Sequence, residues 1–195
     1  MTSPTKLNLK IYQGSTFKET LRWESSTKGY APITGITNAA PMVATSVAHG
    51  IPVGWRGKFS NVVGMLEVNS LDYITVTSTT TDTLTFNSIN SLGFKNYVSG
   101  GVFEYNIPVD LTGFTARMQI RSKLEDPVVI HELTTENGGI EINNTTKVIE
   151  LTIPATTTTG FTFNTAVYSL ELASSGGIVT PFFNGTLTLV KEVTR

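Results

Sequence analysis

Two histidines and a few carboxylates are the side chains of this chain best suited to acid–base or metal chemistry. His49 lies in "AHGI", a turn after a strand, where we expect its ring to be hydrogen-bonded to a neighbouring loop. His131 lies in the middle of "VVIHEL", where a sheet residue faces solvent or packs. Neither has a ligand partner at a spacing that metal sites use. We therefore expect no catalytic histidine, no metal and no cofactor.

The carboxylates do not form a recognisable catalytic pair. A glycosidase needs two of them facing a carbohydrate cleft, and the sequence pairs none. Those at turns or strand starts, where Asp accepts backbone hydrogen bonds, are Asp72, Asp82, Asp110, Glu125 and Asp126. No nucleophile elbow, P-loop or dinucleotide fingerprint occurs. The glycine-rich stretch "NSLGFKNYVSGG" (90–101) leads into a strand, so it offers no helix N-terminus for phosphate. The sequence therefore predicts a protein without enzymatic activity.

Aromatic residues gather between positions 55 and 103, and two interpretations are open. They could form an exposed contact or sugar-stacking patch, or they could fill the core of a small domain. The candidate contact residues are Trp55, Phe59, Phe94 and Tyr97, and Phe103 belongs to the same group. We expect most of them in the core. Trp55 is the expected exposed exception, because it lies in a turn flanked by glycines.

Composition excludes several classes of partner. Charged residues make up 15% of the 195 residues, below the roughly 25% of typical soluble domains. A net charge of −1 with scattered Lys and Arg argues against nucleic-acid binding. No apolar run approaches the roughly 18 residues of a membrane span, and the N-terminus has no apolar signal core. Without cysteine there is no disulfide or thiolate. A surface this poor in charge is common where other subunits cover it.

Alternation with a period of two predicts the elements that position these residues. In "DLTGFTARMQIR" (110–121), Ala116, Met118 and Ile120 alternate with polar residues. Further strands are expected at 6–12, 17–23, 127–133, 139–142, 147–153, 167–172 and 185–193. The Asn137-Gly138 pair predicts a hairpin between two of them. Helix is limited to one turn within 154–161, which could equally be an extended crossover. The pattern favours an all-β antiparallel sandwich.

Residues 33–106 contain strands of their own, expected at 42–48, 56–63, 72–78 and 83–89, with Asp82 in a tight turn. These are enough for a small β-barrel that is entered and left at adjacent points. We therefore expect a sandwich made from residues 1–32 and 107–195. The barrel, residues 33–106, would be inserted into one of its hairpins.

The flanking segments resemble a known domain. The stretches "IYQGSTFKETLRWE" and "IPVDLTGFTARMQIRS" resemble the first strands of a small immunoglobulin-like domain of tailed-bacteriophage structural proteins. "YSLELASSGGIVTPFFNGTLTLVKEVTR" is similar to the closing hairpin of that domain. Its relatives include the N-terminal modules of baseplate upper proteins. The resemblance covers roughly residues 6–30 and 107–195, and it implies an immunoglobulin-like β-sandwich.

The insert has a counterpart as well. It resembles a module of phage tail and fibre proteins that is often labelled as similar to the first catalytic-cysteine half-domain of ubiquitin-activating enzymes. The matching positions are Ala48-His49-Gly50, Val63-Gly64-Met65, Asn69, Tyr73, Phe86, Gly93 and Ser99-Gly100-Gly101. The sequence departs from the pattern at Trp55-Arg56 and at Phe59. The likeness implies a small β-barrel and no ubiquitin chemistry, since the chain has no cysteine.

These resemblances imply a non-enzymatic virion protein made in the host bacterial cytoplasm. We expect an assembly or adaptor subunit of the tail, baseplate, neck or fibre attachment region. Its partners would be other virion proteins, and it would be a homo-oligomer on a symmetric scaffold. A capsid decoration protein and a receptor- or carbohydrate-binding module of a tail fibre remain as alternatives. The segments "KLNLKIY" (6–12) and "GTLTLVKEV" (185–193) are the expected sheet edges for strand addition between subunits.

Overall fold

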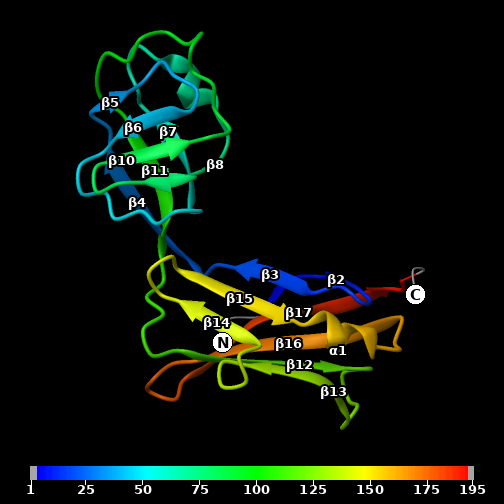
Figure 1. The fold of residues 1–195 in the computed structure, drawn as a ribbon. Coiled ribbons are helices and arrows are strands. Elements are labelled where there is room, and N and C mark those ends of the chain that lie inside the picture. Colours follow the sequence, from blue (N-terminus) through cyan, green and yellow to red (C-terminus); the bar gives the residue numbers. More distant parts are fainter. Residues whose placement is uncertain (1–3, 193–195) are drawn as a thin grey trace. The chain divides into compact units, whose positions relative to one another are not determined.

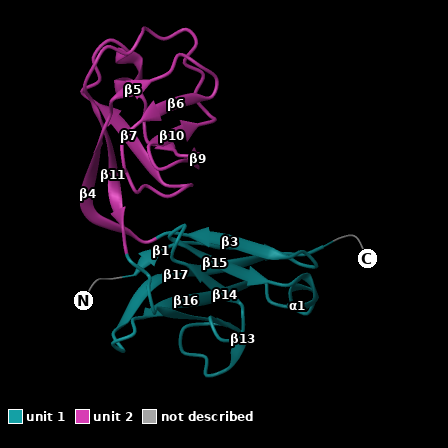
Figure 2. Cartoon of the chain, turned by 60° about the vertical axis from the view of Figure 1, so that its left-hand side comes forward, with its two compact units in different colours: residues 1–22, 110–195 teal, residues 23–109 magenta. Residues whose placement is uncertain are grey.

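The computed structural model describes residues 4–192, and strands account for 49% and helices for 5% of the chain. The predicted all-β class is confirmed. The chain divides into two compact units, one made from the residues up to Arg22 and from Asp110 onward, the other from Trp23–Val109 (Figure 2). The expected boundaries at 33 and 106 differ because β4 (Glu24–Pro32) and β11 (Val102–Pro108) pair with each other inside the second unit.

The first unit is a sandwich of two sheets (Figure 1). The larger sheet has the order β1-β17-β16-β12-β13, and β2 also pairs with β17. Its strands are β1 (Thr5–Lys6), β2 (Leu9–Tyr12), β12 (Thr115–Arg121), β13 (Val129–Thr134), β16 (Thr165–Ala173) and β17 (Val179–Val190). The smaller sheet has the order β14-β15-β3. Its strands are β3 (Phe17–Leu21), β14 (Ile140–Asn143) and β15 (Val148–Ile153).

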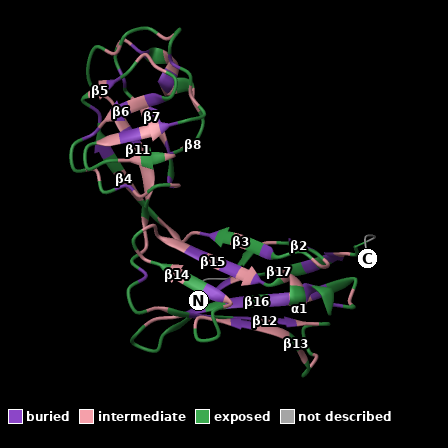
Figure 3. Cartoon of the chain, in the orientation of Figure 1, coloured by how far each residue is buried: buried purple, intermediate pink, exposed green. Residues whose placement is uncertain are grey.

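Alternating burial accounts for the sandwich. On β12, Ala116, Met118 and Ile120 are buried while Thr115 and Arg117 are exposed. Strands β15 and β16 alternate in the same way (Figure 3). Since successive side chains point to opposite faces of a strand, each sheet turns one apolar face toward the other. The antiparallel sandwich is therefore confirmed, although β1 and β2 run parallel to β17.

Two predicted hairpins are wrong. The strands that flank the insert lie in different sheets, because β3 pairs with β15 whereas β12 pairs with β13 and β16. Asn137-Gly138 likewise connects β13 of the larger sheet to β14 of the smaller sheet. The Asn137 side chain accepts hydrogen bonds from the backbone N–H groups of Thr134 and Gly139, at 2.9 Å each. These bonds shape a crossover between sheets where a two-residue hairpin turn was expected.

The second unit consists of two four-stranded sheets, with the orders β5-β6-β10-β9 and β4-β11-β7-β8. Its remaining strands are β5 (Gly35–Ile36), β6 (Met42–Thr45), β7 (Arg56–Ser60), β8 (Ile74–Thr75), β9 (Ser78–Thr79) and β10 (Thr83–Phe86). The described residues form no closed barrel, so that prediction is wrong. At the sheet edges, β5, β8 and β9 have two residues each, whereas β4 has nine.

Helix is scarce in the described residues. The single turn expected within 154–161 is confirmed as α1 (Ala155–Thr159), in which Thr158 is buried. Its hydroxyl donates to the backbone carbonyl of Ser15 at 2.8 Å. A 3₁₀-helix, η1 (Leu66–Ser70), was not predicted.

Candidate functional site

Trp55 lies in the core of the second unit. Its side chain is 0% exposed, and its indole N–H donates to the backbone carbonyl of Asn106 at 2.7 Å. The expectation that Trp55 is exposed is therefore wrong. The flanking glycines were interpreted as the sign of an exposed turn, but Gly57 is needed for close packing. A Cβ at position 57 would lie 2.5 Å from the Phe103 ring.

The other candidate contact residues are also in or against this core. Phe59 is buried, and its ring packs edge-on against Phe103 with 5.1 Å between ring centroids. Phe94 and Tyr97 are partly buried and pack on the same core. The Tyr97 hydroxyl donates to the carbonyl of Ile33 at 2.9 Å. The structure thus brings the four residues together as core and periphery, and they do not form an exposed patch.

His49 holds two loops together, as expected. Its Nδ1 accepts a hydrogen bond from the backbone N–H of Ile51 at 2.9 Å. The proton is therefore on Nε2, which lies 3.0 Å from the carbonyl of Thr80 and 3.2 Å from that of Thr83. Both ring nitrogens of His49 form hydrogen bonds with backbone atoms, so the side chain has a structural role.

His131 faces the interior side of β13, opposite the buried Ile120. Its ring packs edge-on against Phe161 with 5.8 Å between centroids. Burial lowers the pKa of the imidazole, because the charged form loses solvation. The ring is thus packed and neutral near pH 7.

The carboxylates with backbone partners hold turns. Asp82 accepts from the N–H of Ala48 at 2.9 Å, and Asp126 accepts from that of Val128 at 2.9 Å. Asp110 opens the "DLTG" motif and accepts from the hydroxyl of Thr112 at 2.9 Å. Hydrogen bonds from Thr112 and Asn144 lower the pKa of Asp110 to about 2. Among the described residues, no group of three or more His, Asp or Glu could hold a metal ion.

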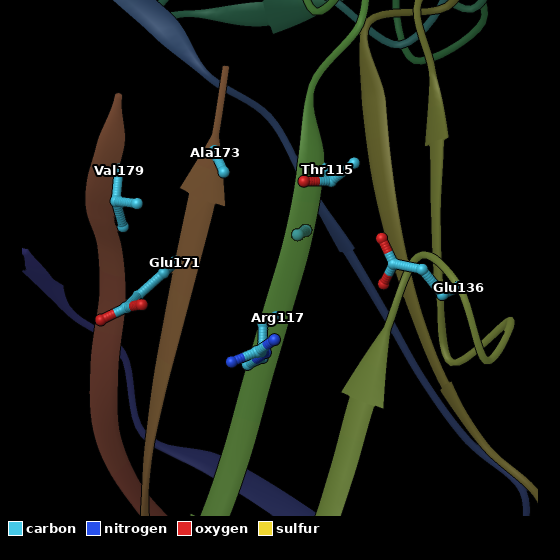
Figure 4. A pocket seen from close by; sticks show the side chains of 7 residues that line it. Thr115, Arg117, Glu136, Glu171, Ala173 and Val179 are labelled. Atoms are coloured by element: carbon cyan, nitrogen blue, oxygen red, sulfur yellow. The ribbon is translucent and has the colours of Figure 1, made fainter. Parts of the chain in front are cut away.

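A shallow hollow of about 220 Å³ lies on the outer face of the larger sheet (Figure 4). Arg117 projects from β12 between Glu171 of β16 and Glu136. The Arg117 Nε lies 3.3 Å from a carboxylate oxygen of Glu132, which also accepts from the Gln119 amide at 3.0 Å. Such ion pairs on a solvated sheet face contribute little to stability. The hollow therefore has the chemistry of a solvent-facing surface.

The edges of the larger sheet differ in how open they are. At the edge strand β13, the Asn137 side-chain amide donates a hydrogen bond to the carbonyl of Glu132 and accepts one from the N–H of Thr134. The side chain thus occupies backbone groups that an added strand would need. β17 pairs with β16 on one side and with β1 and β2 on the other, so the prediction that residues 185–193 form a sheet edge is wrong. Val193, the last residue of that predicted segment, lies outside the described residues. β2 pairs with β17 alone within residues 4–192. The open edge is therefore β2, in the predicted segment 6–12.

The N–H groups of β2 alternate in direction. On either side of β2, the N–H groups of Leu7 and Gln13 donate toward β17, to the carbonyls of Asn184 and Val190. By the two-residue alternation of a strand, Lys10 and Tyr12 direct their N–H groups away from the sheet. Within residues 4–192 no strand pairs with this side of β2, so these groups are open to an added strand.

Searches for relatives found no matching family model and no matching curated protein. In the described part of the chain, no helix is both long and apolar enough to cross a membrane.

Proposed function

We propose that the chain is a non-enzymatic structural protein of a tailed bacteriophage. It would act as an assembly or adaptor subunit of the tail, baseplate, neck or fibre attachment region. The observation that carries the proposal is the nesting of two units. The segments that resemble a phage immunoglobulin-like domain lie mostly in the unit built from both ends of the chain. The segment that resembles a phage tail module lies in the unit between them.

The open β2 edge suggests how such a subunit would attach. An extended segment of a neighbouring virion protein would add to β2 and bond the outward N–H groups of Lys10 and Tyr12. The strand is short and carries an exposed lysine, which limits uncontrolled pairing. Attachment would therefore depend on the symmetric arrangement of neighbours as well as on this edge.

A proline substitution tests this attachment. Lys10→Pro removes an N–H that points away from β17, a position where edge strands tolerate proline. Lys10→Ala removes the same side chain and keeps the N–H, so it is the matched control. We expect both variants to fold, and only Lys10→Pro to be depleted from particles, as measured by quantitative mass spectrometry. Equal incorporation of both variants would rule out β2 as the attachment edge.

Incorporation itself tests the wider proposal. Purified particles of the encoding phage should contain the chain in a fixed number of copies. Its absence from the particles would contradict the virion role whatever the behaviour of β2.

A further inference from the structure

The second unit carries an exposed tyrosine surrounded by cations, on the outer face of the sheet β4-β11-β7-β8. Tyr73 immediately precedes β8 and is 42% exposed. The side-chain nitrogens of Lys28 and Lys58 lie 5.2 Å and 5.9 Å from the centre of its ring. The guanidinium carbon of Arg56 lies 6.0 Å from the same point. We call this group, together with Tyr30 and Glu104, the Tyr73 surface.

Strand register brings these residues together. Glu104 of β11 lies opposite Tyr30 of β4 and opposite Lys58 of β7. The next residue on β11, Tyr105, lies opposite Gly29 and Gly57 and turns to the other face of the sheet. The side chains of the Tyr73 surface therefore share one face, and the core aromatics lie on the other.

Hydrogen bonds and ion pairs hold part of this surface in place. The Lys28 Nζ donates to the Tyr73 hydroxyl at 2.6 Å and lies 3.4 Å from Glu104. The hydrogen bond that Lys28 donates to Tyr73 is the main cause of a raised Lys28 pKa, so this side chain stays charged. The Arg56 guanidinium donates to both carboxylate oxygens of Glu24, at 2.9 Å and 3.3 Å.

One positive charge is left over. The Tyr73 surface carries three cations, Lys28, Arg56 and Lys58. Lys28 pairs with Glu104 of the same surface, and Arg56 pairs with Glu24 at the start of β4. The Lys58 ammonium forms no ion pair or hydrogen bond with any residue that the structure describes. A ligand with one negative charge would therefore complement this face.

The composition of the face distinguishes between classes of partner. The centres of protein–protein interfaces are depleted of Lys and Glu, which dominate here. Nucleic-acid binding requires neutralising several phosphates, and the two carboxylates oppose it. A sugar ring instead offers C–H groups that pack on an exposed aromatic face, and Tyr30 provides a second ring that is 59% exposed.

We propose that the Tyr73 surface binds a carboxylate-bearing sugar residue of a glycan. The sugar ring packs on Tyr73, and its carboxylate accepts a charge-assisted hydrogen bond from Lys58. This goes beyond the assembly role, since it assigns the second unit a contact with the outside of the particle. The sugar-binding proposal and the proposal of incorporation into particles are tested independently, and either can fail without the other.

The test is a titration of the ¹⁵N-labelled full chain followed by NMR. The probes are the methyl glycosides of glucuronic, galacturonic and N-acetylneuraminic acid, with neutral methyl glucoside as the comparison. We expect at least one acidic sugar to shift the amides around Tyr73 and Lys58 with a dissociation constant of about 1–10 mM, a range typical of weak single-residue contacts. The neutral sugar should bind more weakly.

Variants locate the contact. Lys58→Gln should raise the dissociation constant roughly tenfold by removing the charge-assisted bond. Tyr73→Ala should abolish binding, and Tyr73→Phe should keep much of it. Lys95→Gln removes an exposed cation elsewhere in the same unit and should change nothing. The proposal is overturned if no acidic sugar shifts these amides, if the neutral sugar binds as well, or if a short oligo-dT binds this face more tightly.

Discussion

The indole N–H of Trp55 donates a 2.7 Å hydrogen bond to the backbone carbonyl of Asn106. This bond ties the residue before β7 to β11, the neighbouring strand of the same sheet. Its donor is completely buried. Trp55 is therefore expected to be central to the stability of that unit and inaccessible to partners.

Truncation of Trp55 tests this role. Trp55→Ala should lower the free energy of unfolding of the second unit by about 3–5 kcal/mol, the usual cost of removing a buried aromatic side chain. The matched control, Tyr30→Ala, removes an exposed aromatic of the same unit and should change it by less than about 0.5 kcal/mol. Thermal and denaturant unfolding measure both. A Trp55→Ala protein as stable as the control would contradict the buried position.

The Asp110 turn makes stability depend on acid pH. The pKa of Asp110 is lowered from 3.8 to about 2, first by the Thr112 hydroxyl and then by Asn144. A carboxyl with a lowered folded-state pKa contributes stability that is complete above pH 3.8 and is lost as the pH falls through about 2. In the Asp110→Asn variant, the free energy of unfolding should therefore decrease less steeply than in the original chain as the pH falls from 3.8 to about 2. Denaturant unfolding at a series of acid pH values measures this difference.

Thr112→Val separates the hydrogen bond from the charge. It removes the hydroxyl that donates to Asp110 at 2.9 Å and keeps the carboxyl. The pKa of Asp110, followed by carbon-detected NMR, should rise toward 3.8. An unchanged pKa would show that the hydroxyl does not hold the carboxylate.

Tyr168 produces the opposite dependence at alkaline pH. Burial, assisted by the charge of Glu19, raises the pKa of Tyr168 from 10.0 to about 12. Its hydroxyl donates to the carbonyl of Leu7 at 2.7 Å. A raised folded-state pKa means that this contribution is complete below pH 10.0 and is lost as the pH rises through about 12.

Tyr168→Phe checks the sign. It should cost about 0.5–1.5 kcal/mol at neutral pH, because the Leu7 carbonyl loses its donor. Above pH 10.0 the variant should lose stability less steeply than the original chain. Denaturant unfolding at a series of alkaline pH values measures both effects. Parallel curves for the two proteins would contradict the buried hydroxyl.

Excision tests the independence of the two units. The backbone N–H of Val109 donates to the carbonyl of Trp23 at 3.1 Å, so the chain enters and leaves the second unit at adjacent points. A short flexible Gly/Ser linker from Arg22 to Asp110 should therefore leave a sandwich that melts cooperatively. Residues 23–109 alone should also show β structure by circular dichroism. If the shortened chain is unfolded while the full chain melts in one transition, the two units do not fold independently.

Alternation was a reliable guide where both faces of a strand have different environments. Ala116, Met118 and Ile120 were correctly placed in the core because Arg117 and its polar neighbours alternate with them. The prediction of a hairpin at Asn137-Gly138 was wrong because the Asn137 side chain forms hydrogen bonds with β13, and the chain then crosses to the other sheet. The local sequence does not determine the orientation of this side chain. Local signals could not determine which sheet a strand joins.

The candidate contact residues failed for a related reason. Gly54 and Gly57 beside Trp55 signalled an exposed turn, yet Gly57 lies beneath the Phe103 ring. The exposed aromatic, Tyr73, meets Lys28 across 45 positions of sequence. Only the register of β4, β11 and β7 places these side chains on one face, and no motif in the sequence encodes that register.

Cryo-electron microscopy of intact particles tests the virion role most directly. We predict density for both units at symmetry-related positions in the tail, baseplate, neck or fibre attachment region, with β2 against a neighbouring subunit. Density over the capsid lattice would instead support a decoration protein. Particles with no density for this chain at any position would contradict the virion role.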